Sequence, residues 1–177
     1  IIPRKCVLEL KRILTTEKDN KEKLTELSCN NRQISFTVDN FLITSKLIEG
    51  SYPEYKKVIP ENLPNKLLVD RKAFKASLQK MAILSNEQYR GVRLTLNNDE
   101  LKLAANNPSQ EEGEDLIACD YTGPLVEIGF NVSYLVEALD ALQTERVCIK
   151  LNNSDSGCLI TSDKETSPQY VIMPMRV

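Results

Sequence analysis

The chain has 177 residues and a formal net charge of −2 at pH 7, and its 41% hydrophobic and 27% charged residues are typical of a globular protein. It contains no histidine, which excludes serine-type catalytic triads, histidine acid–base catalysis and the common histidine-containing metal sites. No apolar run approaches the roughly 20 residues of a membrane-spanning helix, so no membrane partner is expected.

The cysteines form no close pair and no C-x-x-C motif, so the spacing of zinc ligands is absent and neither a metal nor another cofactor is predicted. An odd number of cysteines without a disulfide framework favours reduced thiols and a cytoplasmic protein. Because the first residue is not Met, we expect the chain to begin inside a longer protein. The five cysteines are Cys6, Cys29, Cys119, Cys148 and Cys158.

The first predicted element is a helix over residues 3–14, indicated by an apolar stripe at helical spacing. An Asn30-Asn31 turn follows, and then a strand within residues 33–40 with an apolar side chain at every second position. Residues 49–66, with three prolines and several charges, are predicted to link two blocks, with the boundary near residue 55. The apolar sets are Cys6, Leu10, Ile13 and Leu14 in the helix, and Ile34, Phe36 and Val38 in the strand.

The same order of signals returns twice after the link. A strand at residues 66–70 precedes a helix over residues 71–84, and a strand at residues 125–131 precedes a third helix. Each helix is followed by an alternating strand and an Asn-Asn turn, a residue type that tolerates positive φ. The apolar sets are Phe74, Leu78 and Met81, then Val92, Leu94 and Leu96; and Leu135, Leu139 and Leu142, then Val147, Ile149 and Leu151; the turns are Asn97-Asn98 and Asn152-Asn153.

These signals define a repeated β-α-β-β-β unit. Two full units run from about residue 66 to the end, and the first 50 or so residues hold one unit that lacks its opening strand. Pairing two such units gives an α+β fold, in which an antiparallel sheet curves over two helices.

Charge is unevenly distributed along the chain. Two of the predicted helices are strongly basic, whereas the third contains Glu137 and Asp140. A solvated surface is the simplest interpretation of each basic helix, but two equivalent basic helices in an acidic protein also fit loose contact with phosphates. The basic residues are Arg4, Lys5, Lys11 and Arg12 in the first helix, and Arg71, Lys72, Lys75 and Lys80 in the second.

The stretch "EEGED" places Glu111, Glu112, Glu114 and Asp115 within five residues. It lacks the regular ligand alternation of a calcium loop, and a solvated loop or a contact with a basic partner surface explains it better. A carboxylate-dependent nuclease is the enzyme alternative, but no phosphate-binding glycine loop or paired-acid motif on strands supports it.

Four motifs, "AILSNEQYRGVRL", "AANNPSQEE", "EIGFNVSYL" and "YVIMPMR", closely resemble the bacterial DNA sliding clamp family, the beta subunits of DNA polymerase III. In this resemblance, residues 1–55 are similar to the second half of the middle clamp domain and residues 56–177 to the complete third domain. It implies the DNA clamp fold, with curved antiparallel sheets outside and helices inside. It also implies a processivity factor without catalytic activity or cofactor.

The resemblance implies a homodimeric ring that surrounds duplex DNA without reading its sequence. Its helices line the hole, and the implied DNA-facing residues are Arg4, Lys5, Arg71, Lys72 and Lys75. It also implies a subunit interface with an apolar part and an acidic part, formed by Ile83, Leu84, Glu111, Glu112 and Glu114. Burial in an ordinary core is the alternative for Ile83 and Leu84.

The family's partners are the DNA polymerase III alpha subunit, the clamp loader and repair polymerases, which insert short apolar peptides into a pocket between the middle and third domains. Two departures are evident: the loops of the opposite wall precede residue 1, and Asp155 stands where the family often has an apolar residue. The alternative function is a generic peptide-binding scaffold of clamp fold that does not tether DNA. The implied pocket residues are Pro53, Val58, Tyr89, Asn131, Tyr134, Val171, Ile172, Met173, Pro174, Met175 and Arg176.

The last eight residues alternate in character. Val171, Met173 and Met175 lie on one side of the predicted terminal strand, and Ile172 and Pro174 lie on the other. Pro174 has no backbone N–H, so we expect strand pairing to fail there. Methionines suit a surface that accepts several peptides, because unbranched side chains repack readily.

Overall fold

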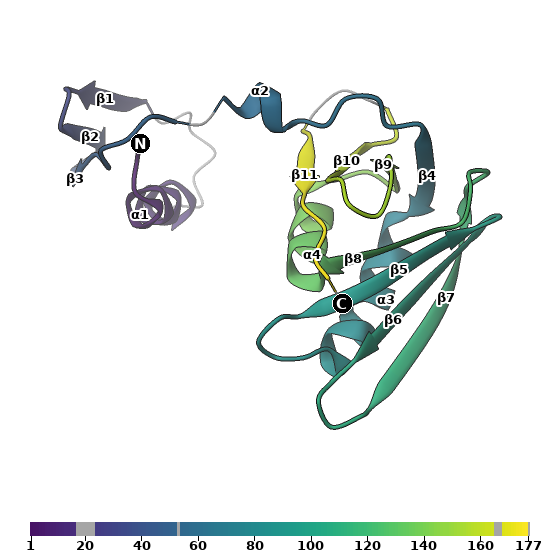
Figure 1. The fold of residues 1–177 in the computed structure, drawn as a ribbon. Coiled ribbons are helices and arrows are strands. Elements are labelled where there is room, and N and C mark those ends of the chain that lie inside the picture. Colours follow the sequence, from purple (N-terminus) through teal and green to yellow (C-terminus); the bar gives the residue numbers. More distant parts are fainter. Residues whose placement is uncertain (17–23, 53, 165–167, 177) are drawn as a thin grey trace. The chain divides into compact units, whose positions relative to one another are not determined.

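The computed structural model describes residues 1–16, 24–52, 54–164 and 168–176. The chain divides into two compact units, unit 1 (Ile1–Glu54) and unit 2 (Tyr55–Val177) (Figure 1). The division lies within the predicted link, which also contains a short helix, α2 (Tyr55–Val58), that sequence patterns did not indicate.

In its described residues, unit 1 contains one helix and a three-stranded antiparallel sheet of order β1-β2-β3. The elements are α1 (Arg4–Thr16), β1 (Thr25–Cys29), β2 (Gln33–Val38) and β3 (Phe41–Lys46). The alternating side chains of β2 are buried as predicted, and its Ile34 and Phe36 pack with Cys6 of α1. Leu14 is exposed, so its predicted place in the helix stripe is wrong. The core of unit 1 is therefore small.

Unit 2 contains an eight-stranded sheet of order β11-β10-β9-β4-β7-β6-β5-β8, in which all recorded pairs are antiparallel. Two successive β-α-β-β-β units build it, as predicted. Their elements are β4 (Asn65–Asp70), α3 (Arg71–Leu84), β5 (Gly91–Asn97), β6 (Glu100–Asn106), β7 (Glu112–Asp120), β8 (Val126–Asn131), α4 (Val132–Ala141), β9 (Arg146–Leu151), β10 (Cys158–Ser162) and β11 (Tyr170–Ile172).

Helices α3 and α4 each begin directly at the end of a strand, where a polar side chain caps the helix. The Asp70 carboxylate accepts the Ala73 N–H at 2.7 Å, and Asn131 Oδ1 accepts the Ser133 N–H at 2.9 Å. Such caps satisfy N–H groups that lack a partner in the first turn. The helix boundaries thus follow from local chemistry, and α3 spans the predicted residues 71–84.

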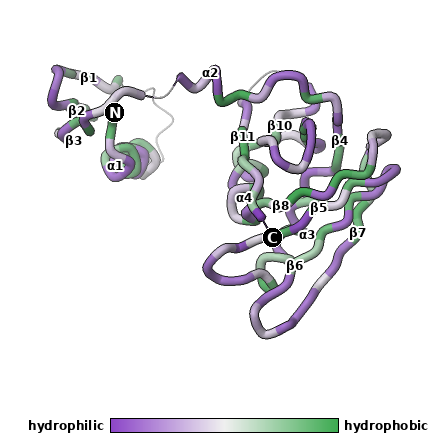
Figure 2. The backbone as a smooth tube through the Cα atoms, in the orientation of Figure 1, coloured by the Kyte–Doolittle hydropathy of each residue, from purple (hydrophilic) through white to green (hydrophobic). Residues whose placement is uncertain are grey.

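The core of unit 2 lies between the helices and one face of the sheet. Helices α3 and α4 pack against each other, and α3 also packs on β4, β5, β6 and β7 (Figure 1). Phe74, Leu78 and Met81 of α3 and Leu135 and Leu139 of α4 are all buried, as predicted. By contrast, the tip that joins β6 to β7 is hydrophilic (Figure 2). The main hydrophobic core of unit 2 therefore lies between these two helices and the sheet.

The Asn-Asn turns occur where predicted, but positive φ explains only one of them. Asn98 has φ 30, whereas Asn30 and Asn153 act through their side chains. Asn30 Oδ1 accepts the Gln33 N–H at 2.8 Å, and Asn153 Oδ1 accepts the Ser156 N–H at 3.0 Å. These two turns are thus fixed by side-chain hydrogen bonds, the other property that favours Asn in turns.

Strand β7 has one largely open edge. It pairs with β6 from Glu112 to Ala118, but β4 pairs with it only at Cys119 and Asp120. In the described part of the chain, the other edge of residues 112–118 has no strand partner. Such an edge presents free backbone N–H and C=O groups.

Candidate functional site

Two segments of unit 2 that are distant in sequence, the Tyr89 loop and the end of β8, meet at the start of α4. Asn131 caps the helix, and its Nδ2 also donates to the Tyr89 carbonyl at 3.2 Å. Tyr134 lies in the first turn of α4, and both tyrosine side chains are exposed. The structure thus brings together Tyr89, Asn131 and Tyr134, three of the predicted pocket residues.

The C-terminal segment passes beside the same strand end. The Met175 N–H donates to the Gly129 carbonyl at 2.9 Å, two residues before Asn131. Ile172 is buried whereas Met173 is 62% exposed, as the predicted alternation requires. Strand β11 ends at Ile172, so pairing stops before Pro174 as expected, and the strand is shorter than the eight-residue alternation indicated.

A close contact fixes the β9–β10 hairpin against this segment. A Cβ at Gly157 would lie 3.0 Å from Met173 Sδ and 3.5 Å from the Ile172 carbonyl oxygen. A side chain at residue 157 would therefore press on the flexible Met173 thioether, so the glycine favours this close approach of the hairpin to the C-terminal segment. Asp155 of this hairpin, Met175 and Arg176 line one hollow of about 500 Å³.

In the described part of the chain, no recorded hydrogen bond joins the other predicted pocket residues, Val171 and Val58, to the Tyr89–Asn131 pair. Val171 is half-buried, and Val58 is exposed at the end of α2. Pro53 lies outside the described residues. The predicted pocket residues that the structure brings together therefore lie at the start of α4, in the Tyr89 loop and in the C-terminal segment, without Val58.

Three of the four basic residues of α3 are engaged within unit 2. Arg71 Nε donates to the Thr144 carbonyl at 2.7 Å, beyond the end of α4. Lys75 forms an ion pair with Asp140, and Lys80 Nζ lies 2.9 Å from the Asp115 carboxylate. The hydrogen bond from Lys80 is the main cause that lowers the pKa of Asp115.

Three other basic side chains on α1 and α3 remain available for contact with a partner. Lys72 on α3 and Arg4 and Lys5 on α1 are exposed and have no ion-pair partner in the part of the chain that the structure describes. Arg71 also has no ion-pair partner among the described residues, but its guanidinium donates to two backbone carbonyls of unit 2. Lys72, Arg4 and Lys5 are therefore the predicted DNA-facing residues that have neither kind of side-chain contact in the described part of the chain.

The end of α3 presents an apolar surface beside the open edge of β7. Ile83 is 84% exposed, so its alternative assignment to the core is wrong. Leu84 is half-buried over Gly113, where an added Cβ would lie 2.2 Å from Leu84 Cδ1. Leu116 on β7 is 61% exposed and was missed, although alternation along β7 indicates its outward direction.

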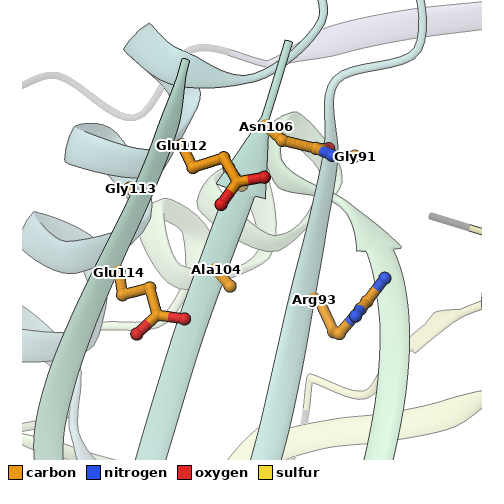
Figure 3. Close-up of a pocket in the computed structure, with 8 residues that line it drawn as sticks. Gly91, Arg93, Ala104, Asn106, Glu112, Gly113 and Glu114 are labelled. Atoms are coloured by element: carbon orange, nitrogen blue, oxygen red, sulfur yellow. The ribbon is translucent and has the colours of Figure 1, made fainter. Parts of the chain in front are cut away.

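The predicted acidic residues lie on and just before β7. Figure 3 shows the side chains of Glu112 and Glu114 projecting over β6 near Ala104, above a hollow of about 150 Å³. Glu114 pairs with Lys102 at 2.6 Å, and Glu111 accepts a hydrogen bond from Asn107 Nδ2 at 2.6 Å. Within the described ranges, no three Cys, Asp or Glu side chains are grouped as metal ligands.

All five cysteines are free thiols, and Cys29 is exposed. Burial raises the pKa of Cys158 to about 12 and that of Cys119 to about 11, which keeps both thiols protonated at neutral pH. These two cysteines are therefore unreactive. Among the described helices, none is long and apolar enough to cross a membrane.

Comparison with known families gives consistent matches along the chain. The family described as "DNA polymerase III beta subunit, C-terminal domain" matches residues 56–176, and its "central domain" matches residues 1–54. Beta sliding clamps of Pseudomonas putida and Escherichia coli K12 are 42% and 41% identical to the chain over 177 residues. Each match covers 100% of this chain and 47% of the relative, so the chain spans about half the length of these relatives.

Solved structures agree with this match. The structure of a Pseudomonas aeruginosa sliding clamp bound to griselimycin has a TM-score of 0.89 at 41% identity. That of a Bartonella birtlesii clamp, also bound to griselimycin, has a TM-score of 0.91 at 35% identity. Each comparison covers 100% of this chain and 47% of the clamp chain. The predicted α+β clamp fold is confirmed, and the chain belongs to the family of DNA polymerase III beta subunits, the beta sliding clamps.

Proposed function

We propose that the chain is part of a processivity factor of bacterial DNA replication, a non-catalytic ring that surrounds duplex DNA and tethers a polymerase to it. The observation behind this proposal is the agreement with sliding clamps over the whole chain, at 41–42% identity. The exposed Arg4, Lys5 and Lys72 would contact phosphates without reading bases. Arg71 and Lys75 belong to the same proposed surface, but their contacts within unit 2 make them secondary.

The second part of the proposal is a peptide-binding surface on unit 2. Tyr89, Asn131, Tyr134 and the segment Val171–Arg176 would receive a short, extended, apolar peptide of a polymerase or clamp loader. The exposed Met173 supplies an adaptable apolar contact. Two similar clamps were crystallised with griselimycin, which supports a ligand site in this family.

The third part concerns assembly. Ile83, Leu84 and Leu116 would form the apolar part of a homodimer interface, with Glu111, Glu112 and Glu114 as its acidic part. The open edge of β7 supports this location, because free backbone groups can pair with a strand of another subunit. Residues 1–55 would be the second half of the middle domain and residues 56–177 the complete third domain, in a cytoplasmic protein.

A retention experiment tests the ring directly. The full-length protein is loaded onto nicked circular DNA with its clamp loader, and bound protein is separated by gel filtration before and after the DNA is linearised. We expect retention on circles even at high salt, and release from linear DNA, because the link is topological and not electrostatic. The Ile83→Arg variant should be lost from circles, since it places a charge in the interface.

The matched control is Leu125→Arg, which changes another exposed apolar side chain of unit 2 outside the proposed interface and should be retained. Equal binding to circular and linear DNA would exclude a ring. No retention on either form would favour the alternative, a peptide-binding scaffold of clamp fold without DNA tethering, for which the ion-paired lysines of α3 are the supporting observation.

A further inference from the structure

A charged hollow of about 500 Å³ lies at the edge of the proposed peptide surface, entirely within unit 2. One wall is the outer side of β8, with Glu127 and Gly129. The second is the β9–β10 hairpin, with Asp155, and the third is the C-terminal segment, with Met175 and Arg176. The Met175 N–H bond to Gly129 joins two of these walls, so the hollow is continuous with the proposed peptide surface.

The hairpin wall is held in place by local contacts. The Asp155 N–H donates to Asn153 Oδ1 at 3.0 Å within the turn. Gly157, just before β10, packs against Met173 of the C-terminal segment. The Asp155 side chain is exposed at the hairpin tip. The Asp155 carboxylate therefore lies beside the hollow on a short hairpin turn that side-chain hydrogen bonds of Asn153 close.

Four charged side chains lie around the hollow, and three of them are available to a ligand. Glu127, Asp155 and Arg176 are exposed and have no ion-pair partner within the described residues. Arg93, the other basic residue on the rim, already has an interaction partner. Glu127 and Asp155 therefore remain available to pair with a cationic group of a bound peptide, and Arg176 remains available for an anionic or carbonyl group.

The shape and composition of the hollow fit a long basic side chain. Met175 also lines it and offers apolar contact to the methylene groups of a Lys or Arg side chain, whereas the Ile128 side chain is buried in the core. The terminal ammonium or guanidinium can then reach the carboxylates, while Arg176 is free to bind a carbonyl or carboxylate oxygen of the same peptide.

We propose that this hollow determines specificity, and that Asp155 and Glu127 select partner peptides with a Lys or Arg side chain next to the apolar anchor. This inference rests on the proposed peptide-binding function and adds the charge of the partner to it. Because the pairs are exposed, the selection is modest and weakens with salt.

Peptide titration tests this selection. Three labelled peptides share a Gln-Leu-Ser-Leu-Phe core and carry Lys, Gln or Glu on both flanks, and each is titrated by fluorescence anisotropy into the full-length protein. We expect the Lys peptide to bind about fivefold more tightly than the Glu peptide at low salt, with the Gln peptide between them. Asp155→Asn should reduce the ratio to about twofold, and the double variant Asp155→Asn/Glu127→Gln should remove it.

The control is Glu145→Gln, which removes an exposed acid of unit 2 outside the hollow and should leave the ratio unchanged. Equal binding of the three peptides, tightest binding of the Glu peptide, or a preference that survives the double variant would overturn the selection and leave the peptide surface intact. If no peptide binds at all, both the selection and the peptide-binding function are refuted.

Discussion

Helices α1 and α3 occupy the same place in the repeating unit and are both rich in Lys and Arg, but they differ in how much of that charge is available. On α1, Arg4 and Lys5 are exposed and unpaired in the described part of the chain. On α3, Lys75 and Lys80 form ion pairs with Asp140 and Asp115. The net charge of a helix therefore does not give its available charge, because neutralising acids come from other elements.

The two helices also differ in packing. The Phe74, Leu78 and Met81 side chains of α3 are buried in the large core of unit 2. On α1, Cys6 is buried, but Leu10 is only partly buried in a much smaller cluster. Helix α3 packs against a second helix and a broad sheet. These neighbours supply both the hydrophobic core around α3 and the acidic partners of its lysines.

The largest expected effect concerns this difference in packing. Phe74→Ala should lower the free energy of unfolding of unit 2 by about 3–5 kcal/mol, because it leaves a cavity in a fully buried site. Leu8→Ala on the exposed face of α1 is the control and should stay within about 0.5 kcal/mol. Urea unfolding followed by the reactivity of the buried Cys158 thiol reports on unit 2, and the reactivity of the buried Cys6 thiol reports on unit 1. A change below 1 kcal/mol for Phe74→Ala would contradict the packing described.

A smaller effect concerns charge. In the full-length protein, Arg4→Gln/Lys5→Gln should weaken binding to linear duplex DNA about tenfold, and the salt slope should fall by about 0.9 for each lost phosphate contact. Asp140→Asn should act in the opposite direction by releasing Lys75, with about twofold to threefold tighter binding. Fluorescence titrations at several salt concentrations measure both changes.

The control for Asp140→Asn is Glu137→Gln, one turn earlier on α4, where the exposed acid has no recorded ion pair. It removes the same charge without releasing a lysine, and it should change the affinity less. If both variants tighten binding equally, the ion pair does not withhold Lys75, and the difference between α1 and α3 does not extend to DNA binding.

The parts of the fold that could be predicted depend on neighbouring residues. The Asp70 cap and the Phe74 stripe place α3 at residues 71–84, and alternation gives the buried side of β5. The exposure of Ile83 also follows from periodicity, because it lies two residues after Met81, about 200° around the helix. The ion pairs of α3 could not be predicted, since Lys75 and Asp140 are 65 residues apart and Lys80 and Asp115 are 35 apart.

In the candidate site, too, contacts between residues distant in sequence could not be predicted. Family motifs indicated Tyr89, Asn131 and the C-terminal segment, but periodicity could not show that Asn131 bonds to the Tyr89 carbonyl or that Met175 bonds to Gly129. The open edge of β7 was also unpredictable, because it depends on the order of strands in the sheet and on how far β4 extends.

The smallest expected effect concerns the Lys80–Asp115 ion pair and its dependence on pH. The pKa of Asp115 in the folded chain is lowered from its ordinary value of about 3.9, chiefly by the Lys80 hydrogen bond. A lowered carboxyl pKa stabilises the folded state above the unfolded pKa, and this stabilisation is lost as the pH falls through the folded pKa. Asp115→Asn should therefore destabilise unit 2 by about 1 kcal/mol at pH 7, and the difference from wild type should shrink as the pH falls below 4.

Urea unfolding followed by circular dichroism between pH 7 and pH 3 measures this difference. Glu112→Gln is the control on the same strand, because Glu112 is exposed and has no recorded ion pair, and its difference from wild type should stay near zero throughout. If the effect of Asp115→Asn does not change with pH, Asp115 contributes through packing and not through its charge. The contrast between α1 and α3 would then be one of buried surface alone, because pairing would not stabilise the charges of α3.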